Sequence, residues 1–174
     1  MSLQKFTVAT ENILRPTKFR ASVIFPAFIG DIEQLRNSCE FLLKDCAIPA
    51  KNVGTIEQFW RGRSIKTAGD TTYDDFSCTF INTSDRKLHK AFLRWSEYID
   101  SSVNDSRSPE ELSYKSSVIT LEKLDNNNNV VGVWFLIGAW PDSVGEIAQD
   151  FNSTDTVELF TVNFKIDYFI SDII

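Results

Sequence analysis

The segment from Val53 to Ile81 consists of extended stretches separated by a turn and a polar loop, and it restricts the possible fold more than any other part of the chain. We predict a hairpin over residues 53–68 with Arg61-Gly62 as its turn, because glycine tolerates the positive φ that tight hairpin turns need. Alternation gives both faces a mixed character, with Ile56, Gln58 and Trp60 on one face and Thr55, Glu57 and Phe59 on the other. Such a hairpin is suited to an edge or arm that a partner covers.

Acidic residues follow the hairpin in a predicted polar loop from Ala68 to Asp75. Its carboxylates, Asp70, Asp74 and Asp75, do not have the spacing of an EF-hand calcium loop, so we expect no metal there. We expect them instead to accept hydrogen bonds from nearby backbone N–H groups.

Two segments alternate apolar and polar residues, which predicts strands with one buried face. They run from Phe76 to Asn82 and from Thr156 to Ile170. The second, at about 15 residues, is much longer than most strands, as in sheets that line a barrel or channel. Expected core residues are Phe76, Phe80, Phe160, Val162, Phe164 and Ile166, and the expected wetter face of the last strand holds Thr161, Asn163 and Lys165.

One long helix is predicted over residues 85–100, because its apolar residues follow the spacing of a single buried stripe. The stripe consists of Leu88, Ala91, Phe92, Trp95 and Ile99, and Phe92 and Trp95 are its main core contributions. His89, the only histidine, lies off the stripe, so we predict that it is solvated. Without a Ser, Cys or carboxylate partner at a recognisable spacing, it is a poor candidate for a catalytic base.

The remaining segments complete a mainly β (α+β) chain. Further strands are predicted at residues 19–25, 118–124 and 130–139, the last of which contributes Trp134 to the core and ends at Trp140-Pro141. Residues 29–37 and 40–47 stay undecided, since periodicity alone does not separate short helices from strands there. We expect one domain over residues 1–174, an antiparallel β-sandwich or barrel with an N-terminal arm (1–18) and a surface loop (101–115).

Composition excludes several classes of function. A net charge of −6 disfavours gripping nucleic acid by phosphate contacts, while allowing nucleic acid to slide past. The three cysteines, Cys39, Cys46 and Cys78, have no close metal spacing, which favours reduced thiols. No phosphate loop, nucleophile elbow or zinc signature is present, so we expect no enzyme activity and no cofactor. Neither an export signal nor a membrane span is expected.

Arg61, Arg63 and Lys66 form one local basic cluster. Three interpretations stay open at this point: a solvated hairpin tip, salt bridges to acidic residues of an adjacent subunit, or contact with phosphate.

The stretch RGRSIKTAGDTTYDDFSCTFIN resembles the central part of tail tube proteins from contractile-tailed bacteriophages. The resemblance rests on basic residues at the turn, then Ala68-Gly69-Asp70, Thr72 and Tyr73, and an alternating strand that ends at Asn82. It continues with Trp140-Pro141, Val144-Gly145-Glu146 and a final strand that ends in Asp167-Tyr168. It covers roughly residues 19–170. The longer N-terminal arm, the residues between Ile29 and Glu40 and the Asn-rich turn at 126–129 depart from the family pattern.

The resemblance implies a subunit of six-fold rings that stack into a hollow tube inside a contractile sheath. Strands of neighbouring subunits would form a barrel around a lumen through which DNA passes without specific binding. Implied partners are other copies of the chain and sheath, baseplate and tail terminator proteins, in a virion tail assembled in the bacterial cytoplasm. Candidate interface or lumen residues are Thr55, Glu57, Arg61, Arg63, Lys66, Asp70, Asp74, Asp75, Thr161, Asn163 and Lys165.

Two alternatives remain. The same fold serves in type VI secretion tubes and contractile bacteriocins, and a monomeric β-sandwich that binds carbohydrate or peptide would also suit an aromatic-rich chain. Size in solution distinguishes the binding module from a tube subunit, because a binding module stays monomeric whereas a tube protein forms rings or polymers.

Overall fold

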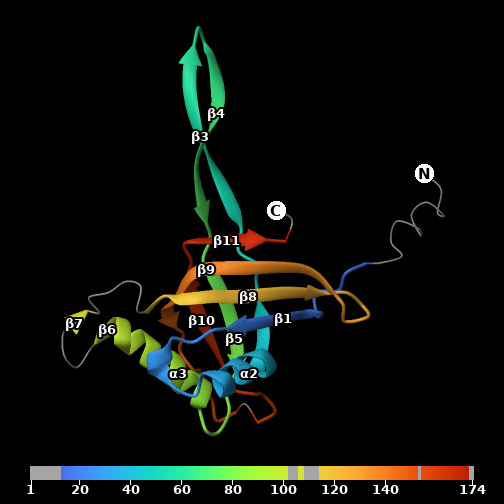
Figure 1. Ribbon diagram of the computed structural model, residues 1–174, viewed down its shortest axis with the longest axis vertical. Helices are drawn as coiled ribbons and strands as arrows, with labels where there is room; N and C mark the ends of the chain where they lie inside the picture. Colours follow the sequence, from blue (N-terminus) through green and yellow to red (C-terminus); the bar gives the residue numbers. More distant parts are fainter. Residues whose placement is uncertain (1–12, 102–105, 108–113, 153, 173–174) are drawn as a thin grey trace, which may run out of the picture.

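The computed structural model describes residues 13–101, 106–107, 114–152 and 154–172. A body of antiparallel strands carries two helices at one end, and a long hairpin projects from the other end (Figure 1). The predicted mainly β fold with a packed helix is confirmed. Among the described residues the sheet stays open, with β1 and β2 at its edges, so this chain alone closes no barrel.

The main sheet has the strand order β1-β8-β9-β10-β5-β2, and every pairing in it is antiparallel. The strands are β1 (Phe19–Val23), β2 (Leu43–Cys46), β5 (Phe76–Ile81), β8 (Ser116–Leu124), β9 (Val130–Val144) and β10 (Leu159–Lys165). β9 pairs with β8 along its first part and with β10 along its last part. It therefore joins the two halves of the sheet.

The longest strand is β9, and not the C-terminal segment as the sequence predicted. The expected single strand over 156–170 is two strands, β10 and β11 (Tyr168–Ser171), separated by Ile166 and Asp167. β9 also continues through Pro141, where we expected it to end. Proline has no N–H to donate to the ladder, and the register with β10 shifts there, between Asn163 and Phe164.

Two α-helices pack against the sheet. α3 (Lys87–Ile99) lies within the predicted range of 85–100, and α2 (Ile32–Leu42) occupies a region that the sequence left undecided. A 3-10 turn, η1 (Ala27–Ile29), precedes α2. Only Leu35 and Cys39 of α2 are buried, one turn apart. This stripe is too narrow for sequence periodicity to reveal.

The core lies between the sheet and the helices and consists largely of aromatic rings. The expected core residues Phe76, Phe80, Phe92, Trp95, Phe160, Val162 and Phe164 are all buried. Phe92 is at the centre of this cluster, within 5.2–6.5 Å of five other rings, centroid to centroid. Trp134 and Ile166 are only partly buried and pack against the margin of the core.

The prediction of a solvated His89 is wrong. The side chain is only 6% exposed and meets the Phe160 ring edge-on at 5.1 Å. Its Nδ1 lies 3.2 Å from Nη2 of Arg86, which donates the hydrogen bond. Burial, and then the neighbouring guanidinium of Arg86, lower the pKa of His89.

The hairpin is longer than the predicted range of 53–68. Its strands are β3 (Lys51–Trp60) and β4 (Arg63–Tyr73), so most of the expected polar loop after Ala68 is strand. Both turn residues have positive φ, 47° at Arg61 and 79° at Gly62, as a two-residue hairpin turn requires. A short pair, β6 (Asp100–Ser101) and β7 (Ser106–Arg107), follows α3. Most of the expected 101–115 loop, and residues 1–12 of the arm, lie outside the described residues.

Candidate assembly surfaces

The β3–β4 hairpin is the most exposed element of the described chain. Every residue of β3 is exposed, and so are nearly all of β4. Large apolar side chains occur on both strands, namely Val53, Ile56, Phe59, Trp60 and Ile65, with Phe59 78% and Trp60 65% exposed. Among the described residues the hairpin pairs only with itself, so the outer backbone edges of both strands lack a β-partner there. Exposed apolar side chains beside open edges are typical of a strand that pairs with another chain.

At the hairpin tip, the predicted basic cluster is partly engaged within the hairpin itself. Lys66 forms an ion pair with Glu57 across the two strands, at 3.1 Å between Nζ and Oε1. The guanidinium of Arg61 lies 5.5 Å from the centroid of the Trp60 ring. The tip therefore combines cations with exposed aromatic rings, whereas Thr55 and Asp70 lie further down the strands.

At the base of the hairpin, the carboxylates bond to side chains. The sequence predicted hydrogen bonds from backbone N–H groups instead. The Asp74 carboxylate accepts a hydrogen bond from the Asn52 amide at 2.7 Å. Asp75 forms an ion pair with Lys165 of β10, at 2.6 Å between Oδ2 and Nζ. The hydrogen bond to Asp75 raises the pKa of Lys165. The first contact joins the bases of the two hairpin strands, and the second connects the end of the hairpin to β10 of the main sheet.

The sheet face opposite the aromatic core is polar, as the alternation of the last strand predicted. The hydroxyls of Thr161 and Thr79 lie 3.3 Å apart, and the Asn163 amide donates to the Ser143 hydroxyl at 3.0 Å. The same face also carries Lys165, which pairs with Asp75. Neutral groups and a paired lysine give this face little net charge.

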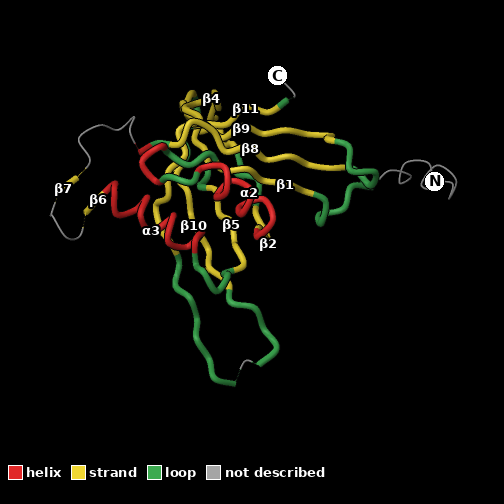
Figure 2. Tube along the Cα trace, turned by 60° about the horizontal axis from the view of Figure 1, so that its bottom comes forward, coloured by secondary structure: helices red, strands yellow, loops and turns green. Residues whose placement is uncertain are grey.

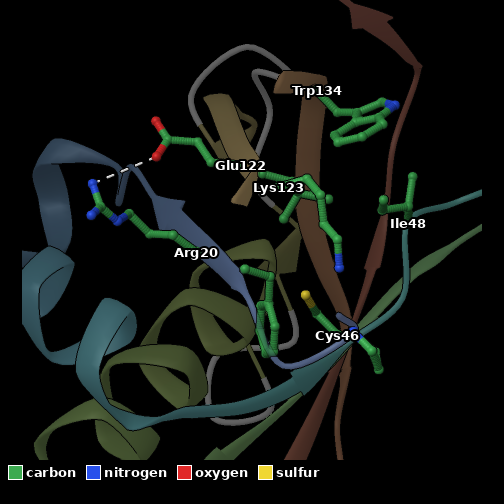
Figure 3. A pocket seen from close by; sticks show the side chains of 9 residues that line it. Arg20, Cys46, Ile48, Glu122, Lys123 and Trp134 are labelled. Carbon is green, nitrogen blue, oxygen red and sulfur yellow. Dashed lines mark ion pairs between the residues drawn. The ribbon is translucent and has the colours of Figure 1, made fainter. Parts of the chain in front are cut away.

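A pocket of about 210 Å³ beside β1 is lined by one thiol, Cys46, and by the charged side chains of Arg20, Glu122 and Lys123 (Figure 3). Burial is the main reason that the pKa of Cys46 rises to about 11, so this thiol stays protonated near neutral pH. The Lys123 ammonium donates to the Arg15 carbonyl at 2.7 Å, and Arg20 pairs with Glu122 at 3.5 Å. The pocket thus lacks an activated nucleophile with a neighbouring base.

Within the described ranges, no cluster of three or more His, Cys, Asp or Glu side chains could hold a metal ion. None of the helices in the described part of the chain has the length and apolar character needed to cross a membrane. Cys39, Cys46 and Cys78 are free thiols.

The geometry thus defines a mainly β protein with a projecting hairpin that carries exposed apolar side chains and whose outer edges no described strand pairs. The chain belongs to the phage tail tube protein family, whose model matches residues 14–172. It is 30% identical over 161 residues to the tail tube protein of Serratia phage KSP90, covering 92% of this chain and 90% of that one. It is 28% identical to the tail tube protein gp19 of Enterobacteria phage T4, covering 81% and 86%.

The fold agrees with a solved structure as well. A tube-containing complex of an extracellular contractile injection system, the PVC sheath-tube complex in its extended state, matches with a TM-score of 0.66 at 15% identity. The match covers 99% of this chain and 98% of that chain. The prediction of a phage tail tube structural subunit is therefore confirmed, and the binding-module alternative is not supported.

Proposed function

We propose that copies of this chain, each a single tail-tube domain over residues 1–174, form six-fold rings that stack into a hollow tube inside a contractile sheath. The observation that carries this proposal is the β3–β4 hairpin, with exposed apolar residues and two open edges. An isolated two-stranded hairpin is marginally stable in water, so pairing with a neighbouring copy supplies what it lacks. Strands from successive copies close a barrel that leaves no edge exposed.

The polar sheet face fits the wall of the lumen. Thr161, Asn163 and the paired Lys165 present hydrogen-bonding groups and little net charge. The chain as a whole carries a charge of −6, which repels a polyanion. DNA therefore passes through the tube without being held by it.

The remaining partners follow from the same role. Sheath, baseplate and tail terminator proteins contact the outside and the ends of the tube, and the tube is assembled in the bacterial cytoplasm before it becomes part of the virion tail. The subunit acts as a structural component and not as an enzyme, in agreement with the protonated Cys46 and the bonded Lys123 in its pocket.

A hairpin variant tests this proposal. Phe59→Ser/Trp60→Ser removes the exposed aromatic surface of the tip, whereas Phe41→Ser removes an equally exposed ring from α2. Sedimentation should show loss of rings and polymers for the tip variant alone, with unchanged thermal unfolding of its subunit. Normal assembly of the tip variant would overturn the role given to the hairpin.

A further inference from the structure

A groove between the two helices has a cationic rim. The groove has a volume of about 160 Å³ and lies between the start of α2 and the exposed side of α3. Its floor includes Ile29, Leu35 and Ala91, and its α3 rim carries Lys87, Lys90 and Arg94. Asp31 is the single acidic residue that lines it. The groove therefore combines an apolar floor with an excess of positive charge.

This positive charge is concentrated on one side of α3. Lys87, Lys90 and Arg94 are exposed on the side of α3 away from the core, where Glu97 is the acidic residue among them. Lys87 forms a long pair with Asp85 at 3.7 Å, and the Lys90 ammonium donates to the Asp85 carbonyl at 3.2 Å. Arg94 makes no ion pair with the described residues. In a chain with a charge of −6, such a cationic stripe is a local exception.

The loop between β9 and β10 has the opposite character. Residues 145–158 contain four carboxylates and no Lys, Arg or His. Its described residues, 145–152 and 154–158, extend well away from the sheet at the end of the body where the helices lie (Figure 2). Within it, the ring of Phe151 is fully exposed, and Val157 is largely exposed. Carboxylates beside an exposed aromatic ring are the chemical complement of a cationic rim over an apolar floor.

We propose that the cationic groove between α2 and α3 binds the acidic 145–158 loop of a second copy of this chain. Phe151 contacts the apolar floor, and carboxylates of the loop pair with Lys90 and Arg94. None of the described loop residues of its own chain lines the groove, and the proposal assigns the occupant to a neighbouring copy. A groove and a loop on different parts of one surface make a head-to-tail contact, the kind that builds rings and filaments. The inference rests on the proposed tube assembly and adds a contact independent of the hairpin.

Charge reversal tests the groove. Arg94→Glu should raise the protein concentration needed for assembly by roughly tenfold, because it places like charges against the loop. Lys44→Glu is the matched control, since Lys44 is also exposed and lies on β2, away from the groove. Asp155→Arg on the loop should weaken assembly similarly. Combining Arg94→Glu with Asp155→Arg should restore assembly to within roughly threefold of the wild type, since the two charges then attract again.

The apolar part of the contact is tested separately. Phe151→Ser should weaken assembly, whereas Phe41→Ser, which removes another exposed ring, should not. Wild-type protein that forms no rings or tubes would contradict the proposed function itself. Wild-type protein that assembles while Arg94→Glu and Phe151→Ser assemble at the same concentration would overturn only this contact. Loss of sheath binding by normally assembling Arg94→Glu tubes would also overturn it, by assigning the groove to a different protein.

Discussion

Gly138 and Asp167 are packed so closely that no side chain fits between them: a Cβ on Gly138 would collide with the Asp167 carboxylate. Gly138 has φ +69°, in the left-handed region that favours glycine. The Asp167 N–H donates to the Ile137 carbonyl at 3.0 Å, and its carboxylate pairs with Lys115 at 2.9 Å. These contacts fix the point where the chain leaves β10 and returns to β9 as β11.

A methyl group at Gly138 should therefore destabilise the subunit. Gly138→Ala combines a strained φ with a steric collision, and we expect a loss of roughly 2–4 kcal/mol in the free energy of unfolding. Gly62→Ala is the matched control: it has φ +79° but open space around its Cβ, so the strain alone should cost roughly 1 kcal/mol. Urea unfolding of both variants measures the difference. Equal losses would show that the contact with Asp167 is unimportant.

The aromatic cluster should make the largest contribution of any group to stability. Phe92 is fully buried among five rings, so Phe92→Ala should cost roughly 3–5 kcal/mol of unfolding free energy. Phe164→Asp buries a charge in the same cluster and should abolish soluble folding. Phe41→Ala on the exposed face of α2 should change stability by less than about 0.5 kcal/mol. A soluble, fully assembling Phe164→Asp protein would contradict this assignment of the core.

Stability should depend on pH through His89. Its pKa is lowered in the folded protein, so the folded state binds fewer protons than the unfolded chain. The contribution of His89 is then complete above the ordinary pKa of 6.5 and is lost as the pH falls through the folded value. Urea unfolding between pH 7 and 5 should show a steeper loss for the wild type than for His89→Gln. His89 is the only histidine. The same pH dependence of unfolding in the wild type and in His89→Gln would therefore show that His89 does not cause the loss of stability.

Thiol labelling should follow burial. Cys39 and Cys78 are buried, and the half-buried Cys46 has a pKa of about 11. At pH 8 all three thiols should react slowly with a thiol reagent in the native protein, with Cys46 the fastest, and all three should react at once in denaturant. Rapid labelling of Cys39 in the native protein would contradict the packing of α2.

Strict alternation of apolar and polar residues predicted β5 and the two faces of β10. The helical spacing of apolar residues predicted α3. The break at Ile166 and Asp167 was not predictable, because alternation continues through it and the bend depends on distant Gly138 and Lys115. Burial of His89 depends on Phe160, far away in the sequence. The hairpin extended past Ala68 because pairing across the strands outweighs the polar character of Gly69 to Thr72.

The most direct test of the central claim is negative-stain electron microscopy of the purified protein over a concentration series. The proposed assembly predicts six-fold rings at low concentration and hollow filaments of constant width at high concentration. Monomers at every concentration, including when purified baseplates are added as nuclei for assembly, would contradict it.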